Sequence, residues 1–220
     1  MSDLYNHNVK TLYEAMDQST RRIGIVQTNL ANAKTIGFKS IHPDSVMFSS
    51  VLDEAFRDEE QGVLMKTGQK LDLALSKAGA YFLVEGKDGK PAKTRDGQFH
   101  LNEDGKIVDF QDRELVILDK QIDKPEYELL AKGGDIMIDQ NGHINVNGSF
   151  IGRIAVEYEA TTPGDRVFVV QGQLETSNVD LSSNITKIMQ IKRHIDTVQS
   201  VLSMELGVDK ALIETYGRNV

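Results

Sequence analysis

Residues 9–30 read VKTLYEAMDQSTRRIGIVQTNL, and the spacing of their apolar side chains predicts a long helix. The repeating positions are three and four residues apart in alternation, which places them along one stripe of a helix. The stripe consists of Val9, Leu12, Met16, Ser19, Ile23, Val26 and Leu30. Ser2 or Asp3 can cap the start of this helix, and Gly37 can end it. We therefore expect an N-terminal helical arm at residues 1–36.

The other end of the chain repeats this pattern. Its apolar stripe consists of Ile188, Ile191, Ile195, Val198 and Leu202. Residues 177–180 (SNVD), which precede it, are typical of a helix N-cap followed by an acidic residue. We expect a second helical arm at residues 174–220, and the heptad spacing favours coiled-coil-like packing of the arms with each other or with neighbouring molecules. The alternative for either stripe is one face of a helix in an ordinary core.

The middle of the chain has the pattern of a β domain. Residues 71–75 (LDLAL) alternate strictly, and Asp-Gly and Asn-Gly turn signals separate short hydrophobic runs. Further strands are expected at residues 81–84, 154–158 and 167–170. The prediction is an α+β fold, in which a connecting segment at residues 37–70 leads to a central, mainly antiparallel β domain at residues 71–173.

An internal echo lies within this middle part. Residues 99–107 and 136–144 match in the position and type of their apolar, Asn, Asp and Gly residues. Two similar hairpins explain the match. A calcium loop would need Asp or Asn at its first, third and fifth positions and Gly at the sixth, and His143 and Ile144 break that order.

Composition excludes several classes of function. The chain has no cysteine, which excludes a disulfide scaffold, a thiol nucleophile and a cysteine-ligated metal. Its net charge is −8, and the Lys and Arg of residues 1–34 and 174–220 balance the Asp and Glu there, so the middle carries the whole excess. An acidic chain without clustered cations is not expected to bind nucleic acid. No apolar run approaches the length of a membrane span, and no signal peptide is expected.

Catalytic motifs are lacking as well. The five histidines form no pair at helical spacing, and no serine lies in a nucleophile elbow. The acidic run Asp58-Glu59-Glu60 is typical of a solvated face. We therefore expect no catalytic residue, no metal site, no cofactor and no enzyme.

Residues 29–39 read NLANAKTIGFK. They are similar to the N-terminal signature of the bacterial flagellar rod and hook family, in which a helix ends in Asn-Leu-Ala-Asn before Thr-x-Gly-Phe. Residues 174–180 (LETSNVD), followed by 188–193, are similar to its C-terminal signature. Residues 71–75 and 94–99 (TRDGQF) resemble segments of those members that carry a β domain. The motif residues are Asn29, Leu30, Ala31, Asn32, Gly37, Phe38, Leu174, Glu175, Ser177, Asn178 and Val179.

This resemblance implies a structural subunit of the flagellar basal-body rod. Such a subunit would be exported from the cytoplasm by the flagellar type III apparatus and would assemble in the periplasmic space with itself and with other rod and hook proteins. The apolar stripes would then be the assembly interface. The short segment between Phe38 and Leu71 favours a proximal rod protein over a distal-rod or hook-type paralogue. A secreted β-rich binding module is the alternative of another class.

Gly37 and Asn178 are expected to act as hinges where each arm meets the β domain. A left-handed Gly37 would let the chain leave the first helix sharply. Asn178 would supply a capping oxygen for the second helix. On this interpretation, substitutions at either position redirect an arm without unfolding the β domain.

Overall fold

The structure is a computed structural model, and it describes residues 2–42, 57–86, 89–119, 135–158 and 166–217 of the 220. The chain divides into two compact units. The helical unit comprises Met1–Ala31, Ile41–Arg57 and Val179–Val220, and the β unit comprises Asn32–Ser40 and Asp58–Asn178. Helices at both ends flank an antiparallel β region in sequence, which confirms the predicted α+β fold.

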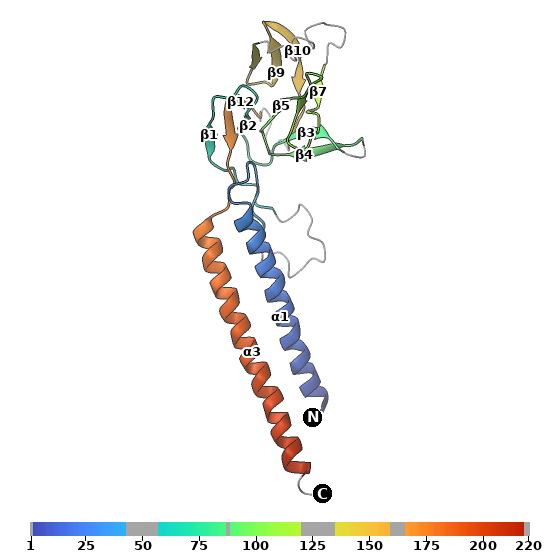
Figure 1. The fold of residues 1–220 in the computed structure, drawn as a ribbon, viewed down its shortest axis with the longest axis vertical. Helices are drawn as coiled ribbons and strands as arrows, with labels where there is room; N and C mark the ends of the chain where they lie inside the picture. Colours follow the sequence, from blue (N-terminus) through green and yellow to red (C-terminus); the bar gives the residue numbers. More distant parts are fainter. Residues whose placement is uncertain (1, 43–56, 87–88, 120–134, 159–165, 218–220) are drawn as a thin grey trace. The chain divides into compact units, whose positions relative to one another are not determined.

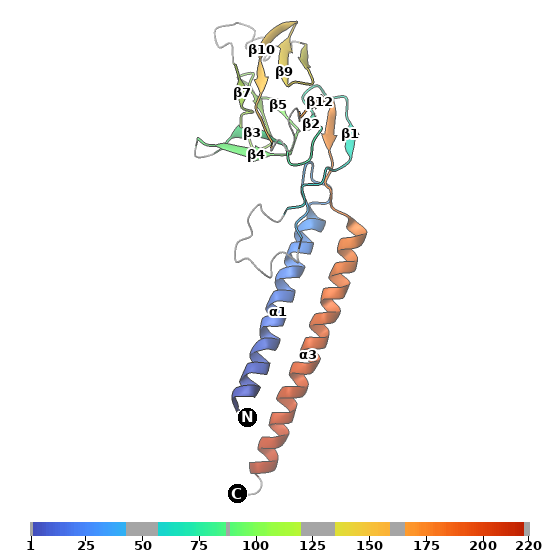
Figure 2. The same ribbon diagram turned by 180° about the vertical axis from the view of Figure 1, so that it is seen from behind.

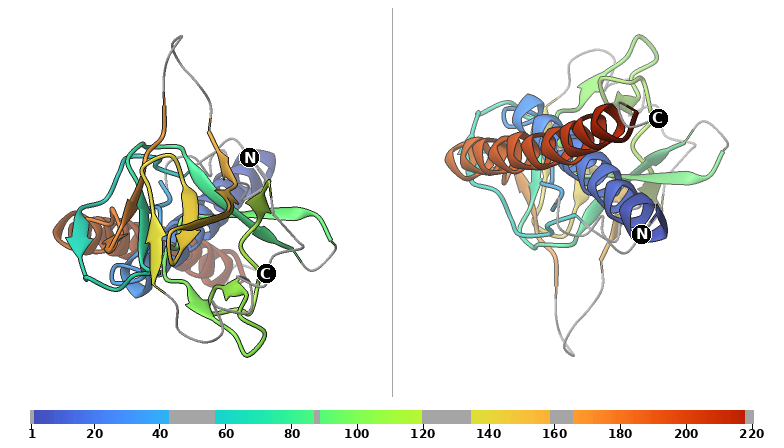
Figure 3. Two further views of the ribbon diagram at one scale, coloured as in Figure 1. Left: turned by 90° about the horizontal axis from the view of Figure 1, so that it is seen from above. Right: turned by 90° about the horizontal axis from the view of Figure 1, so that it is seen from below.

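The helical unit is built from α1 (Ser2–Ala31) and α3 (Leu181–Gly217). Asp180 caps the start of α3, because its Oδ1 accepts a hydrogen bond of 3.1 Å from the N–H of Ser183. The two helices pack against each other. Figures 1 and 2 show them side by side with opposite chain directions, and the right-hand view of Figure 3 shows that they cross.

Within the described residues, the β unit consists of short strands in five small sheets. The strands are β1 (Leu64–Lys66), β2 (Leu73–Leu75), β3 (Tyr81–Glu85), β4 (Pro91–Thr94), β5 (His100–Leu101), β6 (Ile107–Val108), β7 (Ile117–Leu118), β8 (Ile136–Ile138), β9 (His143–Val146), β10 (Ser149–Ile154), β11 (Val156–Glu157), β12 (Val169–Gln171) and β13 (Gln173–Glu175). The sheets have the orders β7-β10-β9-β8, β11-β3-β4, β1-β13, β12-β2 and β5-β6. Every pairing is antiparallel, as predicted.

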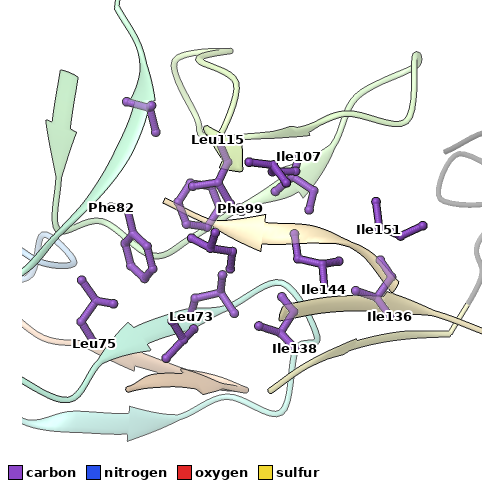
Figure 4. Packing of buried hydrophobic residues seen from close by; sticks show 14 of the residues in the cluster. Leu73, Leu75, Phe82, Phe99, Ile107, Leu115, Ile136, Ile138, Ile144 and Ile151 are labelled. Atoms are coloured by element: carbon purple, nitrogen blue, oxygen red, sulfur yellow. The ribbon is translucent and has the colours of Figure 1, made fainter. Parts of the chain in front are cut away.

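One hydrophobic core joins four of these sheets (Figure 4). Every second side chain of a strand points into this core. In β3, Phe82 and Val84 are fully buried, while their neighbours Tyr81 and Leu83 are half-buried. The rings of Phe82 and Phe99 meet edge to face with centroids 5.5 Å apart. Large side chains that are fully buried in this core include Leu73, Leu75, Phe82, Ile107, Leu115, Ile144 and Ile151. Four of the five sheets, all except β1-β13, therefore contribute residues to one apolar interior.

The echo seen in the sequence is a repeated five-residue turn, found at residues 102–106, 109–113 and 139–143. In each copy the Oδ1 of the first residue accepts hydrogen bonds of 2.8 to 3.1 Å from the N–H groups of the third and fifth residues. The fourth residue has a positive φ: 75° at Gly105, 57° at Asp112 and 80° at Gly142. The two predicted hairpins are confirmed. The third copy was not predicted because it has no glycine.

Asp112 stands where the two other turns have glycine, so Asp112→Gly tests the cost of this conformation. We expect the substitution to raise the free energy of unfolding by about 0.5 to 1 kcal/mol, since a side chain at positive φ is strained. Gly105→Ala is the matched opposite change and should lower it by at least a similar amount. Urea titration followed by circular dichroism measures both. An unchanged Asp112→Gly midpoint would mean that the turn tolerates aspartate without strain.

Candidate functional site

The eleven apolar residues of the two predicted stripes are all at least partly covered. Val26 and Val198 are buried. The half-buried ones are Val9, Leu12, Met16, Ile23, Leu30, Ile188, Ile191, Ile195 and Leu202. Ser19, the polar position of the first stripe, is buried and donates to the carbonyl oxygen of Ala15 at 2.8 Å. Both stripes therefore lie on covered faces of their helices, yet most of their side chains keep exposed surface.

A buried pair of asparagines links α1 to α3. The Asn29 Nδ2 donates to the Asn184 Oδ1 at 3.3 Å, and both side chains are almost completely buried. Asn29 also binds the backbone of Ile41, donating from Nδ2 to its carbonyl oxygen at 2.8 Å and accepting at Oδ1 from its N–H at 2.9 Å. The first asparagine of the N-terminal motif thus fixes the chain that follows α1. Asn184 was missed, although it extends the second stripe. It lies four residues before Ile188, which fits the three- and four-residue spacing.

A further apolar row on α3 is left uncovered. Leu181, Ile185 and Met189 are four residues apart, and they are 47%, 47% and 54% exposed. A spacing of four places them on one side of the helix, beside the covered stripe. This row was not predicted, because sequence periodicity shows which side chains share a face but not which face a neighbour covers.

The β unit contains an ion triad that is almost completely buried. The Lys39 Nζ lies 2.7 Å from the Glu175 Oε1, and the Arg95 Nε lies 2.6 Å from the Glu175 Oε2. The exposed fractions of the Lys39, Arg95 and Glu175 side chains are 4%, 3% and 2%. Charges removed from water to this extent stabilise a protein only when their hydrogen bonds are satisfied.

Backbone groups supply the remaining partners of this triad. The Lys39 Nζ donates to the carbonyl oxygen of Glu60 at 2.6 Å, and Arg95 donates from its guanidinium to the carbonyl oxygen of Ala80. The Glu175 Oε1 also accepts from the N–H of Gly62 at 2.9 Å. Segments far apart in the sequence are therefore tied to one carboxylate.

Each of the three sequence motifs contributes one member of the triad. Lys39 ends the N-terminal motif, Arg95 lies in the middle motif, and Glu175 belongs to the C-terminal motif. Lys39 and Arg95 were not predicted as site residues, since nothing in local spacing pairs residues that are 136 and 80 positions from Glu175. The signal that could have found them is the presence of charged residues in each motif, two each in residues 29–39, 94–99 and 174–180.

The Asn178 side chain joins its own segment to the backbone of two others, at Ser40 and at residues 58–60. It is not the cap of α3. Its Oδ1 accepts from the N–H of Ser40 at 2.7 Å, and its Nδ2 donates to the carbonyl oxygens of Asp58 and Glu60 at 2.9 and 3.0 Å. The capping role expected for Asn178 is wrong, because Asp180 performs it. Its amide fits the task, since it offers a donor and an acceptor at once.

Gly37 has the left-handed conformation that was predicted, with φ of 65°. Its N–H donates to the carbonyl oxygen of Glu175 at 2.8 Å. A Cβ at this position would lie 2.4 Å from the carbonyl oxygen of Arg95 and 2.7 Å from the nitrogen of Asp96. Gly37 therefore serves packing inside the β unit, and the expectation that its substitution leaves this unit folded is revised.

The other motif residues have local roles or none that the structure reveals. Asn32 accepts from the Thr35 hydroxyl at 3.1 Å in the turn after α1. Leu174 is buried. Ala31 is exposed, and Phe38, Ser177 and Val179 are half-buried.

Burial raises the pKa of the Asp96 carboxyl, and a hydrogen bond from the N–H of Gln98 opposes this.

Within the described ranges, no cluster of three His, Asp or Glu side chains is arranged as a metal site. No helix of the described chain combines the length and apolar composition that a membrane crossing requires. The carboxylate of the triad is occupied by its own cations, so this cluster ties the fold together and offers no open reactive group.

The triad predicts that Glu175→Ala destabilises the β unit strongly. Removing the carboxylate leaves two buried cations without their partner, which costs about 3 to 5 kcal/mol. Glu157→Ala is the matched control, because the exposed Lys93–Glu157 pair has the same short distance of 2.7 Å, and its loss should cost no more than about 1 kcal/mol. Urea unfolding of both variants measures the difference. Equal losses would contradict a structural role for the buried triad.

The close approach at Gly37 generates a second prediction. Gly37→Val should lower the free energy of unfolding by well over about 1 kcal/mol, because it adds both strain at positive φ and a clash with the backbone of Arg95. Gly68→Val is the control, since Gly68 has φ of 74° but no atom lies within 4 Å of the place that its Cβ would take. Thermal unfolding should rank the two variants in this order. The reverse order would show that the approach at Gly37 is not tight.

Comparison with known proteins gives matches over most of the chain. Residues 77–146 match the domain described as "Flagellar hook protein FlgE/F/G D1 domain". The chain is 31% identical to the flagellar basal-body rod protein FlgF of Rhizobium meliloti, over 90% of this chain and 92% of that protein. It is 26% identical to the FlgF of Caulobacter vibrioides, over 90% and 93%. The flagellar hook protein FlgE of Brucella melitensis is 27% identical, over 71% of this chain but only 39% of that protein.

Proposed function

This chain belongs to the flagellar basal-body rod protein family, and we propose that it is a structural subunit of the rod. It assembles with copies of itself and with other axial proteins into the shaft that transmits torque to hook and filament. The match over 90% of the chain carries this proposal. A catalytic role is not part of it.

A place in the rod is supported by the two FlgF relatives, which match 90% of the chain at 31% and 26% identity, whereas the hook protein of Brucella melitensis matches 71% of it. Within the rod we propose the proximal part, which the short segment between Phe38 and Leu71 supports. The resemblance to the axial family supports two further parts of the proposal, export by the flagellar type III apparatus and residence in the periplasmic section of the basal body.

The terminal helices are the proposed assembly interface. The α1–α3 contact leaves most stripe residues half-buried, and the row Leu181, Ile185 and Met189 is exposed. Full burial of one such side chain contributes about 1.5 to 3 kcal/mol, so neighbouring helices that cover this row would stabilise the assembly by several such increments. Coiled-coil-like packing would then arise between subunits as well as within one. The residues of both stripes and of this row are the ones we assign to the interface.

Met189→Asp tests this interface. We expect a strain that carries it in place of its own rod gene to lose swimming, because an aspartate carboxylate cannot be buried against an apolar neighbour without several kcal/mol of cost. The purified variant should keep its helical content, since Met189 is 54% exposed in one molecule. Gln190→Asp, an exposed polar position on the same helix, is the control and should swim normally.

Swimming speed, together with detection of the subunit in isolated basal bodies, gives the result. Normal incorporation of Met189→Asp would remove this row from the interface. Loss of swimming in both variants would indicate that any added charge on α3 is harmful, and it would not support a specific contact.

A further inference from the structure

The β unit exposes one phenylalanine at the tip of a turn. Phe110 is 71% exposed, in the turn at residues 109–113, and its ring centroid lies 5.8 Å from that of His100. An exposed aromatic ring of this kind is typical of contact surfaces, where it supplies a large apolar area. We call Phe110 and its turn the Phe110 knob.

The knob is rigid. Asp109 is buried, and its carboxylate accepts from the N–H groups of Gln111 and Arg113 and from the Arg113 guanidinium at 2.7 Å. Burial alone would raise the pKa of Asp109, but these hydrogen bonds outweigh it and hold the pKa below its usual range. Asp112 keeps a strained φ of 57° in the same turn. A preorganised tip loses little conformational entropy on binding.

The surroundings of the knob are acidic. A cavity of about 580 Å³ beside the turn is lined by four acidic residues and two basic ones. The charged residues lining it are Glu85, Asp104, Asp112, Glu114, Lys106 and Arg113. The cavity beside the turn that carries Phe110 therefore has an excess of negative charge in its lining.

A second cavity of the β unit has the opposite character. It has a volume of about 290 Å³, and its charged lining residues are Arg153 and Arg166. Leu118, Val156 and Val167 line it with apolar surface, and Leu118 is 42% exposed. Arg153 is exposed, and its guanidinium lies 3.9 Å from the Asp119 carboxylate, at the limit of an ion pair. We call this cavity the Arg153 pocket.

The knob and the pocket are separate parts of the β unit, because neither the turn at residues 109–113 nor the cavity beside it shares a residue with the lining of the Arg153 pocket. Two complementary surfaces at different places on one molecule generate a head-to-tail contact, which builds rings or helical filaments.

We propose that the Phe110 knob of one copy of this chain docks in the Arg153 pocket of the next copy. Phe110 covers the apolar lining, and the acids around the knob face Arg153 and Arg166. This inference rests on the proposed function, since it adds a contact between β units to the assembly by helices. The charge of the chain favours it: the middle part carries the whole −8, so neighbouring β units repel unless acidic surface meets cations.

Cross-linking tests the contact without background, because the chain has no cysteine. Purified Gln111→Cys and Asn141→Cys chains, which keep Phe110 and the apolar lining of the pocket, are mixed over a concentration series with a short thiol-specific cross-linker. The inference expects a covalent dimer from the mixture, and a ladder of higher species from the chain that carries both substitutions. Met137→Cys, which is 63% exposed elsewhere in the β unit, replaces Gln111→Cys in the control and should give neither. Absence of the dimer, or equal yield with the control, overturns the inference.

Charge reversal separates docking from chance collision. Arg153→Glu together with Arg166→Glu in the Asn141→Cys chain should lower the dimer yield roughly tenfold or more, since acids would then face acids. Asp104→Lys in the Gln111→Cys chain should restore part of that yield. If neither change alters the yield of cross-linked dimer, the proposed charge pairing is overturned.

The same cysteine variants in swimming cells distinguish this inference from the proposed function. A wild-type chain that does not replace a rod gene contradicts the proposed function, whereas the purified chains still decide whether knob and pocket bind. Swimming cells whose Gln111→Cys and Asn141→Cys positions never cross-link contradict the docking alone. Cross-links from Gln111→Cys to a different axial protein, and not to this chain, also overturn it.

Discussion

Burial of the Glu175 carboxylate between Lys39 and Arg95 is the interaction on which the β unit depends. These side chains come from the segment that follows α1, from the middle of the β region and from the strand that leads to α3. The N–H of Gly37 binds the carbonyl oxygen of the same Glu175, and the N–H of Asn178 binds that of Phe38 at 3.4 Å. The points at which the chain enters and leaves the β unit are thereby tied to each other.

The buried ion triad can hold distant segments of this chain in place for a physical reason. A short apolar core built from strands of two to six residues offers few ways to hold distant segments in register. Charge-assisted hydrogen bonds have strict geometry, so a buried carboxylate with two cations accepts only one arrangement of the three segments. The cost of desolvating the charges is offset only in that arrangement, which makes the triad a specifier of structure more than a source of net stability.

Local patterns predicted the local structure well. The three- and four-residue spacing identified both helices, and the positive φ of Gly37 followed from its position after a helix. The turn echo followed from side chains that bond to their own backbone, which is also a local property. The triad, the Asn178 contacts and the approach of Gly37 to Arg95 join residues far apart in the sequence, so no periodicity reveals them. Asn184 lies between these cases, since it continues a local stripe but its buried partner Asn29 is 155 residues away.

The two units bury different kinds of groups, and this difference bears on assembly. The β unit satisfies its buried charges internally and has one apolar core, although Phe110 and Met137 remain exposed. The helices bury Val26 and Val198 but keep an exposed apolar row on α3 and a stripe of half-buried side chains. A chain of this kind can be stable before assembly through its β unit and still gain burial when copies meet through its helices. Because the helical arms carry no net charge and the acidity lies in the middle, close packing of helices from many copies avoids the repulsion that the same packing of acidic surfaces would create.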